Sequence, residues 1–82
     1  MEYRVGQVVR SIAGRDNGTA YVVLRIEGNY VYVADGAIRK LENPKKKKFK
    51  HIQGSYKISE EIVSHIIDGT LENYMLRRFL SS

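Results

Sequence analysis

The amino-acid sequence predicts a mainly β protein, with a small five-stranded antiparallel barrel followed by a short C-terminal two-helix tail. Short runs rich in β-branched and aromatic residues recur at about 8–12-residue spacing, and tight turns separate them. After residue 55 the apolar residues change from a period of two to helical spacing. The length of 82 residues leaves room for one core. We therefore expect the barrel over residues 1–55 and the helical extension over residues 56–82.

The first hairpin is expected between Val5 and Leu24, with a polar loop over residues 14–18. Gly14 and Gly18 bracket this loop and can adopt the positive φ that a tight turn requires. The second strand, over residues 20–27, alternates apolar and polar residues. This period predicts that its even-numbered residues face the core and that its odd-numbered residues, Tyr21 among them, face largely outward.

Turns at Gly28-Asn29 and Asp35-Gly36 delimit a third strand over residues 30–34, and residues 37–41 are expected to form a fourth. Pro44 breaks that strand because proline has no backbone donor. The run of four lysines that follows is predicted to be an exposed loop, since adjacent ammonium groups are rarely buried. A fifth strand is expected over residues 49–52.

The tail predicts two helices. Ser59 is a suitable N-cap for the first, acidic residues follow in its first turn, and Asp68-Gly69 supplies a stop signal. Thr70 is predicted to cap the second, which places Leu71, Tyr74, Met75 and Phe79 on one face. Such short helices must pack on the barrel, on each other or on a partner.

The formal net charge of +5 is concentrated in one segment, because residues 39–50 hold seven lysine or arginine side chains and one glutamate. A basic patch of this kind favours a polyanionic partner, nucleic acid before anionic membrane, while a solvated solubility patch is the alternative. The chain has no cysteine, no apolar run long enough to span a bilayer and no N-terminal signal pattern. We expect a cytoplasmic protein.

The motifs carry a family resemblance. Val5-Gly6-Gln7-Val8-Val9, the Gly14–Gly18 loop and Val22-Val23 resemble a KOW motif. Further elements follow in order: Ala34-Asp35-Gly36, Arg39-Lys40, Asn43-Pro44-Lys45-Lys46-Lys47 and Lys50-His51-Ile52. Together they resemble the archaeal and eukaryotic large-subunit ribosomal protein family fourteen-e, and still more the small bacterial KOW-domain RNA-binding proteins related to it. The resemblance covers roughly residues 4–53.

This resemblance implies an SH3-like barrel that binds ribosomal RNA, with Gly18 as the near-obligatory glycine of the motif. The chain departs from the motif at Asn17, where many KOW loops have lysine, and at Ala20, where many have glycine. Both changes lower the expected contribution of the loop to phosphate binding. Asp16 also stands beside Arg15 and balances its charge, so we expect the hairpin to organise the barrel and Arg15 to be an auxiliary contact.

The expected RNA contacts are basic, polar and aromatic side chains. They are Arg15, Asn17, Tyr21, Arg39, Lys40, Lys45, Lys46, Lys47, Lys48, Lys50 and His51. If about six of the cations neutralise phosphates, the logarithm of the RNA association constant (log K) falls with the logarithm of the salt concentration, with a slope near −4 to −5. Unpaired bases stack on aromatic rings, and Tyr21 is the first candidate platform, followed by Tyr30 and Tyr32.

The sequence holds no pattern typical of an enzyme. Its two histidines, His51 and His65, lie in different predicted elements without metal-ligand spacing, and there is no phosphate-binding loop or nucleophile elbow. We expect a non-enzyme that needs no cofactor or metal. Two alternatives remain open: a protein-interaction module of the translation or transcription machinery, and self-association through the C-terminal helices.

Overall fold

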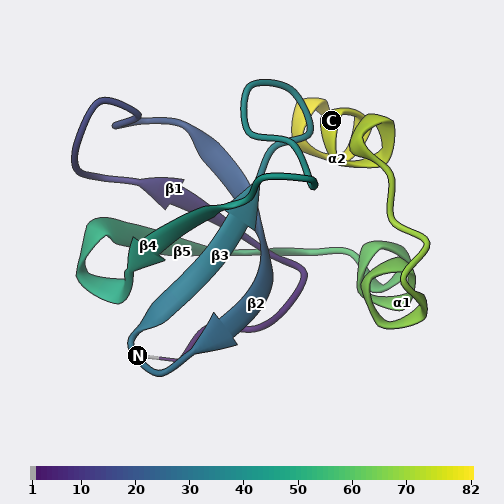
Figure 1. Cartoon of the computed structure of the whole chain (residues 1–82), viewed down its shortest axis with the longest axis horizontal. Coiled ribbons are helices and arrows are strands. Elements are labelled where there is room, and N and C mark those ends of the chain that lie inside the picture. Colours follow the sequence, from purple (N-terminus) through teal and green to yellow (C-terminus); the bar gives the residue numbers. More distant parts are fainter. Residues whose placement is uncertain (1) are drawn as a thin grey trace.

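The computed structural model describes residues 2–82, and it is built on one antiparallel sheet with the strand order β4-β3-β2-β1-β5 (Figure 1). The strands are β1 (Gln7–Ser11), β2 (Ala20–Glu27), β3 (Tyr30–Ala34), β4 (Lys45–Lys48) and β5 (Ile52–Ile58). A 3-10 turn, η1 (Phe49–His51), joins β4 to β5, and the helices α1 (Glu60–Asp68) and α2 (Asn73–Ser81) follow. The mainly β class, the five antiparallel strands and the two-helix tail predicted from the sequence are confirmed.

The sheet is curved but not closed. Consecutive strands β1 to β4 pair with their neighbours in the chain, and β5 returns to pair with β1. The strands β4 and β5 therefore form opposite edges of the sheet, although only η1 separates them in the sequence. The predicted barrel is thus an open one. The fifth strand, expected over residues 49–52, instead covers Ile52–Ile58, and residues 49–51 form η1.

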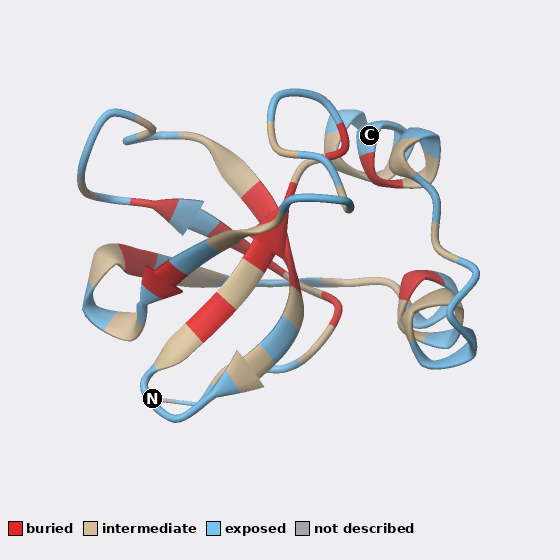
Figure 2. Ribbon diagram, viewed as in Figure 1, coloured by how far each residue is buried: buried red, intermediate tan, exposed pale blue. Residues whose placement is uncertain are grey.

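Apolar side chains cover both faces of the sheet. One face, which we call the inner face, carries a cluster of Val9, Tyr21, Val23, Val31, Val33 and Ile52. On the outer face Val22 and Ala34 pack against Ile62 of α1 and Leu76 of α2, so the helical tail packs on the sheet (Figure 2). The helices lie at the end of the sheet remote from the β2–β3 turn (Figure 1). The outer face near that turn is therefore left open.

The predicted division of β2 into core and solvent positions is wrong in its first half. Tyr21 and Val23 are buried in the inner cluster, while Val22 is buried beneath the helices. A bulge between Val23 and Arg25 then shifts the alternation, and Ile26 packs against the inner cluster. Both sets of residues are buried because the tail supplies a second apolar layer on the outer face.

The connection between β3 and β4 also differs from the prediction. Residues 37–41, expected as a strand, form a loop in which Ile38 is 95% exposed. The Asp35 carboxylate shapes this loop by accepting hydrogen bonds from the backbone N–H groups of Ala37 (2.9 Å) and Arg39 (2.8 Å). The fourth strand is instead formed by the lysine run, which was predicted to be an exposed loop.

The first helix has the predicted ends, whereas the second begins later than expected. The Ser59 hydroxyl accepts a hydrogen bond from the Ile62 N–H at 3.3 Å. At the other end, Gly69 and Thr70 donate their N–H groups to the carbonyls of Ile66 and His65, which is a Schellman ending. Thr70 therefore closes α1 and does not cap α2, whose N-cap is Glu72.

Candidate nucleic-acid interface

The strand β4 sorts its four lysines onto two faces of the sheet. Successive side chains of a strand point to opposite faces. Lys45 and Lys47 stand opposite Val33 and Val31, whose side chains belong to the inner cluster. Lys46 and Lys48 stand opposite Tyr32 and Tyr30 on the outer face. The run therefore contributes two lysines to each face.

The inner lysines neutralise Asp16 of the β1–β2 loop. Lys47 is only 7% exposed, and its Nζ lies 3.1 Å from Asp16 Oδ1, 3.0 Å from Ser11 Oγ and 3.2 Å from the Ala13 carbonyl oxygen. Lys45 Nζ lies 3.2 Å from Asp16 Oδ2. The Ser11 hydroxyl donates to Oδ1 at 2.8 Å, so each carboxylate oxygen has at least two donors. Among residues 2–82, no buried side-chain nitrogen or oxygen atom lacks a partner.

This network corrects three predictions for the site. Tyr21 is 3% exposed and donates its hydroxyl to Asp16 Oδ2 at 2.7 Å, so no base can stack on it. Lys47 is buried, and Lys45 is held beside the same carboxylate, so neither is a free phosphate contact. The charge of Asp16 is balanced by these two lysines and not by Arg15.

The electrostatics of the network follow from its burial and its donors. Burial alone would raise the pKa of Asp16, but the hydrogen bonds from Tyr21, Ser11, Lys47 and Lys45 outweigh it and hold that pKa well below its usual range. Burial, followed by the hydrogen bond to the Asp16 carboxylate, raises the pKa of Tyr21. Asp16 is therefore ionised and Tyr21 neutral at physiological pH.

The tip of the β1–β2 loop remains available to solvent. Arg15 and Asn17 are exposed, and Gly14 and Gly18 both have positive φ, at 83° and 94°. The Gly18 N–H donates to the Ser11 carbonyl at 2.8 Å, which closes the loop over the Asp16 network. The buried carboxylate thus fixes the loop from below, while Arg15 stays free at its tip.

The outer lysines belong to a surface of tyrosines and cations that we call the open face; it comprises Arg25, Tyr30, Tyr32, Lys46 and Lys48. Lys46 Nζ lies 4.4 Å from the centre of the Tyr30 ring and 5.9 Å from that of Tyr32. The Arg25 guanidinium carbon lies 4.1 Å from the Tyr32 ring centre, and its Nε pairs with Glu27 at 3.3 Å. Tyr30 and Tyr32, the lesser stacking candidates from the sequence, are the ones on the surface.

A shallow groove of about 400 Å³ continues the open face around the β2–β3 turn. We call it the turn groove; its lining is Asn29, Tyr30, Lys48, Phe49 and Lys50. The Phe49 N–H donates to the Asn29 carbonyl at 2.9 Å, which brings η1 against the turn. His51 is half-buried at the end of η1.

The remaining predicted contacts lie elsewhere. Arg39 and Lys40 belong to the loop over residues 35–44, which packs beside α2 (Figure 1). Arg39 is half-buried and donates to the Asn43 carbonyl at 3.3 Å, whereas Lys40 is exposed. The basic segment over residues 39–50 is therefore divided between this loop, the Asp16 network, the open face and the turn groove.

Sequence reasoning missed Arg25, Asn29 and Phe49. Arg25 carried a signal, since its odd-numbered position in the second strand predicted an outward side chain. No sequence signal indicated a role for Asn29 or Phe49 in the site, because only the pairing of β3 with β4 and the hydrogen bond between the turn and η1 bring them together. Their contribution to one groove depends on contacts between residues twenty positions apart.

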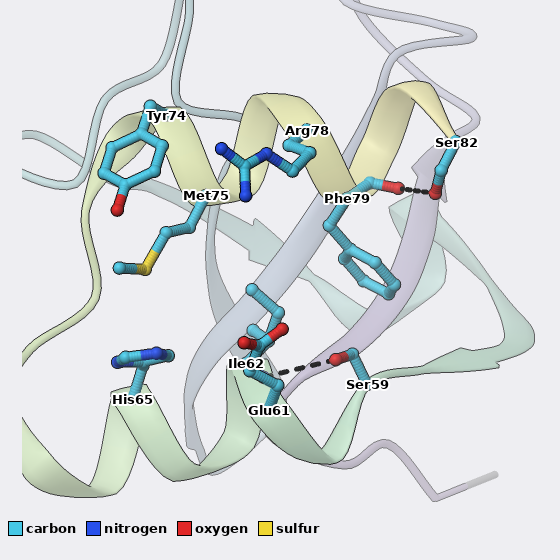
Figure 3. Close-up of a pocket in the computed structure, with 9 residues that line it drawn as sticks. All are labelled: Ser59, Glu61, Ile62, His65, Tyr74, Met75, Arg78, Phe79 and Ser82. Atoms are coloured by element: carbon cyan, nitrogen blue, oxygen red, sulfur yellow. Dashed lines mark hydrogen bonds between the residues drawn. The ribbon is translucent and has the colours of Figure 1, made fainter.

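A second concavity, of about 300 Å³, lies between α1 and α2 (Figure 3). Ile62, Met75 and Phe79 form its apolar part, and Arg78 and His65 lie at its polar side. Most of the apolar stripe of each helix is used against the sheet, but Tyr74 is 44% exposed beside this cleft.

No group of acidic, histidine or cysteine side chains suited to hold a metal ion occurs within residues 2–82. In the same part of the chain, neither helix has the length and apolar character needed to cross a bilayer. Comparison with protein-family models and with curated proteins finds no match for this chain. The resemblance to KOW proteins therefore stays a prediction from the motifs.

Proposed function

We propose that this chain is a cytoplasmic, non-enzymatic RNA-binding protein, and that the open face and the turn groove contact the RNA. The observation that carries the proposal is the placement of Lys46 over two tyrosine rings, with Arg25 over one of them. Cations bind phosphates and exposed aromatic rings stack on bases, so this combination suits a nucleic acid better than a purely apolar partner.

The charge distribution supports the same proposal. Lys45 and Lys47 form ion pairs with Asp16. The exposed cations of the open face and the turn groove are therefore Arg25, Lys46, Lys48 and Lys50. Four phosphate contacts correspond to a slope of about −3 to −4 in log K against log salt. This is shallower than the slope expected from the sequence, because two lysines are engaged inside the protein.

The resemblance to KOW proteins directs the proposal to ribosomal RNA and to a structural or accessory role in translation. The open face would then dock on structured RNA, with the lysines positioning the protein along the phosphates. Arg15 and Asn17, at the tip of the β1–β2 loop, and His51 provide auxiliary contacts. Co-migration with one ribosomal subunit in a fractionated lysate would identify the particle.

The test is retention on immobilised ribosomal RNA across a salt gradient. The variant Lys46→Gln/Lys48→Gln should elute at lower salt than the parent protein and show a slope reduced by about 1.5. Lys40→Gln is the matched control, since it removes an exposed lysine from the loop beside α2. Retention that is absent or independent of salt would favour the protein-interaction alternative, for which the cleft between α1 and α2 is the available surface.

A further inference from the structure

We propose that the turn groove binds one unpaired nucleotide, with its base against Tyr30 and its phosphates at Lys48 and Lys50. This inference rests on the proposed function and narrows it from RNA in general to RNA with an accessible base. The groove of about 400 Å³ lies at the small end of the range for ligand sites, which suits a single nucleotide.

The geometry supplies each part of such a site. Tyr30 and Lys48 are direct partners in the pairing of β3 with β4, so their side chains lie side by side on the outer face. The backbone hydrogen bond from Phe49 to Asn29 brings a second aromatic ring to the groove. Phe49 also packs on Tyr3, with ring centres 5.0 Å apart, which limits its movement.

The polar lining fits a nucleotide. Lys48 and Lys50 are exposed, and neither forms an ion pair with any of residues 2–82. No acidic side chain lines the groove. Asn29 is exposed and lines the groove, where its amide offers both a donor and an acceptor to the edge of a base.

One ring face in this site is already in contact with Lys46 Nζ, at 4.4 Å from the Tyr30 centre. Tyr30 is half-buried and Lys46 is exposed. A cation–π contact at the surface is weaker than the stacking of a base on an aromatic ring, so a base can displace the ammonium group. The displaced lysine remains next to the incoming nucleotide and can pair with its phosphate. The same side chain therefore shields the ring in the free protein and contacts the backbone in the complex.

The class of RNA follows from this arrangement. A base can enter the groove only if its face and its Watson–Crick edge are free, and in an A-form helix both are engaged by stacking and pairing. A duplex still offers its phosphates to the open face, and it should bind without using Tyr30. Binding of single strands and of loops should therefore depend on the groove, whereas binding of a duplex should not.

The experiment measures the affinity of the full chain for three labelled probes at one salt concentration. The first is an oligouridylate of roughly ten nucleotides, within the site sizes of single-strand binders. The second is its abasic form, which keeps every phosphate, and the third is its duplex with oligoadenylate. The variants are Tyr30→Ala, Phe49→Leu and the control Tyr56→Ala, which removes a fully exposed tyrosine from β5.

We expect the parent protein to bind the oligouridylate about tenfold more tightly than its abasic form. Tyr30→Ala should remove this difference, Phe49→Leu should reduce it, and Tyr56→Ala should leave it unchanged. Equal affinity of the parent protein for the intact and abasic probes, with salt-dependent binding of both, would overturn the inference and leave the proposed function standing. No binding of any probe at low salt would overturn both. The comparison of probes on the parent protein does not depend on the folding of a variant.

Discussion

Replacing Lys47 with methionine distinguishes the structural lysine of β4 from the neighbouring lysines that we propose to bind RNA. Lys47→Met keeps most of the volume of the side chain but removes the ammonium group that contacts Asp16, Ser11 and Ala13. Lys48→Met is the matched control, because it makes the same chemical change one residue away on the exposed side of the strand.

The magnitude follows from burial. Removing one partner of a buried ion pair typically costs about 3–5 kcal/mol. Asp16 keeps the donors Lys45, Tyr21 and Ser11, so we expect the lower end, about 3 kcal/mol. A chain of this length has a free energy of unfolding of about 4–12 kcal/mol. The loss should lower Tm by roughly 12–24 °C. Lys48→Met, at an exposed position, should change stability by less than about 0.5 kcal/mol.

The assay combines thermal unfolding followed by circular dichroism with RNA titration below the Tm of each variant. Lys47→Met should unfold early but keep the affinity and the salt slope of the parent protein. Lys48→Met should keep its Tm and lose about 0.7–0.9 from the salt slope. If Lys47→Met unfolded like the parent protein and weakened RNA binding as much as Lys48→Met, Lys47 would be a phosphate ligand and the buried network would be wrong.

Three further predictions concern stability and assembly. The pKa of Asp16 is lowered in the folded state, so its stabilisation is complete above about pH 4 and is lost as the pH falls further; Asp16→Asn should flatten this part of a Tm-against-pH curve. Gly36 has a φ of 78°, and an added Cβ would collide with the Asn73 carbonyl of α2, so Gly36→Ala should cost about 2 kcal/mol or more in a urea titration. Gly28→Ala, at a positive φ with open space around it, should cost less. A chain ending at Ile58 loses the helices that cover the outer cluster, so sedimentation should show aggregation of this fragment and a monomer for the full chain; a stable monomeric fragment would contradict the packing described above.

The sequence predicted the elements whose signals are local. The turns at Gly28-Asn29 and Asp35-Gly36 and the cap at Ser59 depend on neighbours a few residues away, and each lies where it was expected. The prediction that the lysine run is an exposed loop was wrong for the opposite reason, because the conformation of this run depends on distant residues. Lysine is normally exposed. The burial of Lys47 depends on the Asp16 carboxylate, which lies thirty-one positions earlier and cannot be inferred from the residues next to Lys47 in the chain.

The residues of the candidate site could be predicted only in part, because their placement also depends on contacts between distant segments. The concentration of charge in residues 39–50 indicated the segment that supplies Lys46, Lys48 and Lys50 to the candidate surface, but charge counts do not assign side chains to faces. A period of two predicts one buried and one solvated face, so Tyr21 was expected to point outward. In the structure the side of the strand that carries Tyr21 faces the inner cluster, while the helical tail covers the opposite side, so neither side is solvated there. Tyr30 and Tyr32 remain on the surface because the helices stop short of the β2–β3 turn.

The identity of the four residues of β4 has a consequence for how its pairing is specified. In most strands a slip by one residue exchanges apolar and polar side chains, and this mismatch keeps the alignment unique. In β4 such a slip exchanges lysine for lysine, so the run itself does not select its alignment with β3. The selection falls to the residues at its ends: Pro44, which cannot extend the ladder, and Phe49, which packs beside Tyr3 against the inner cluster. Loss or gain of one lysine in the run should therefore do damage by displacing Phe49, more than by changing the charge.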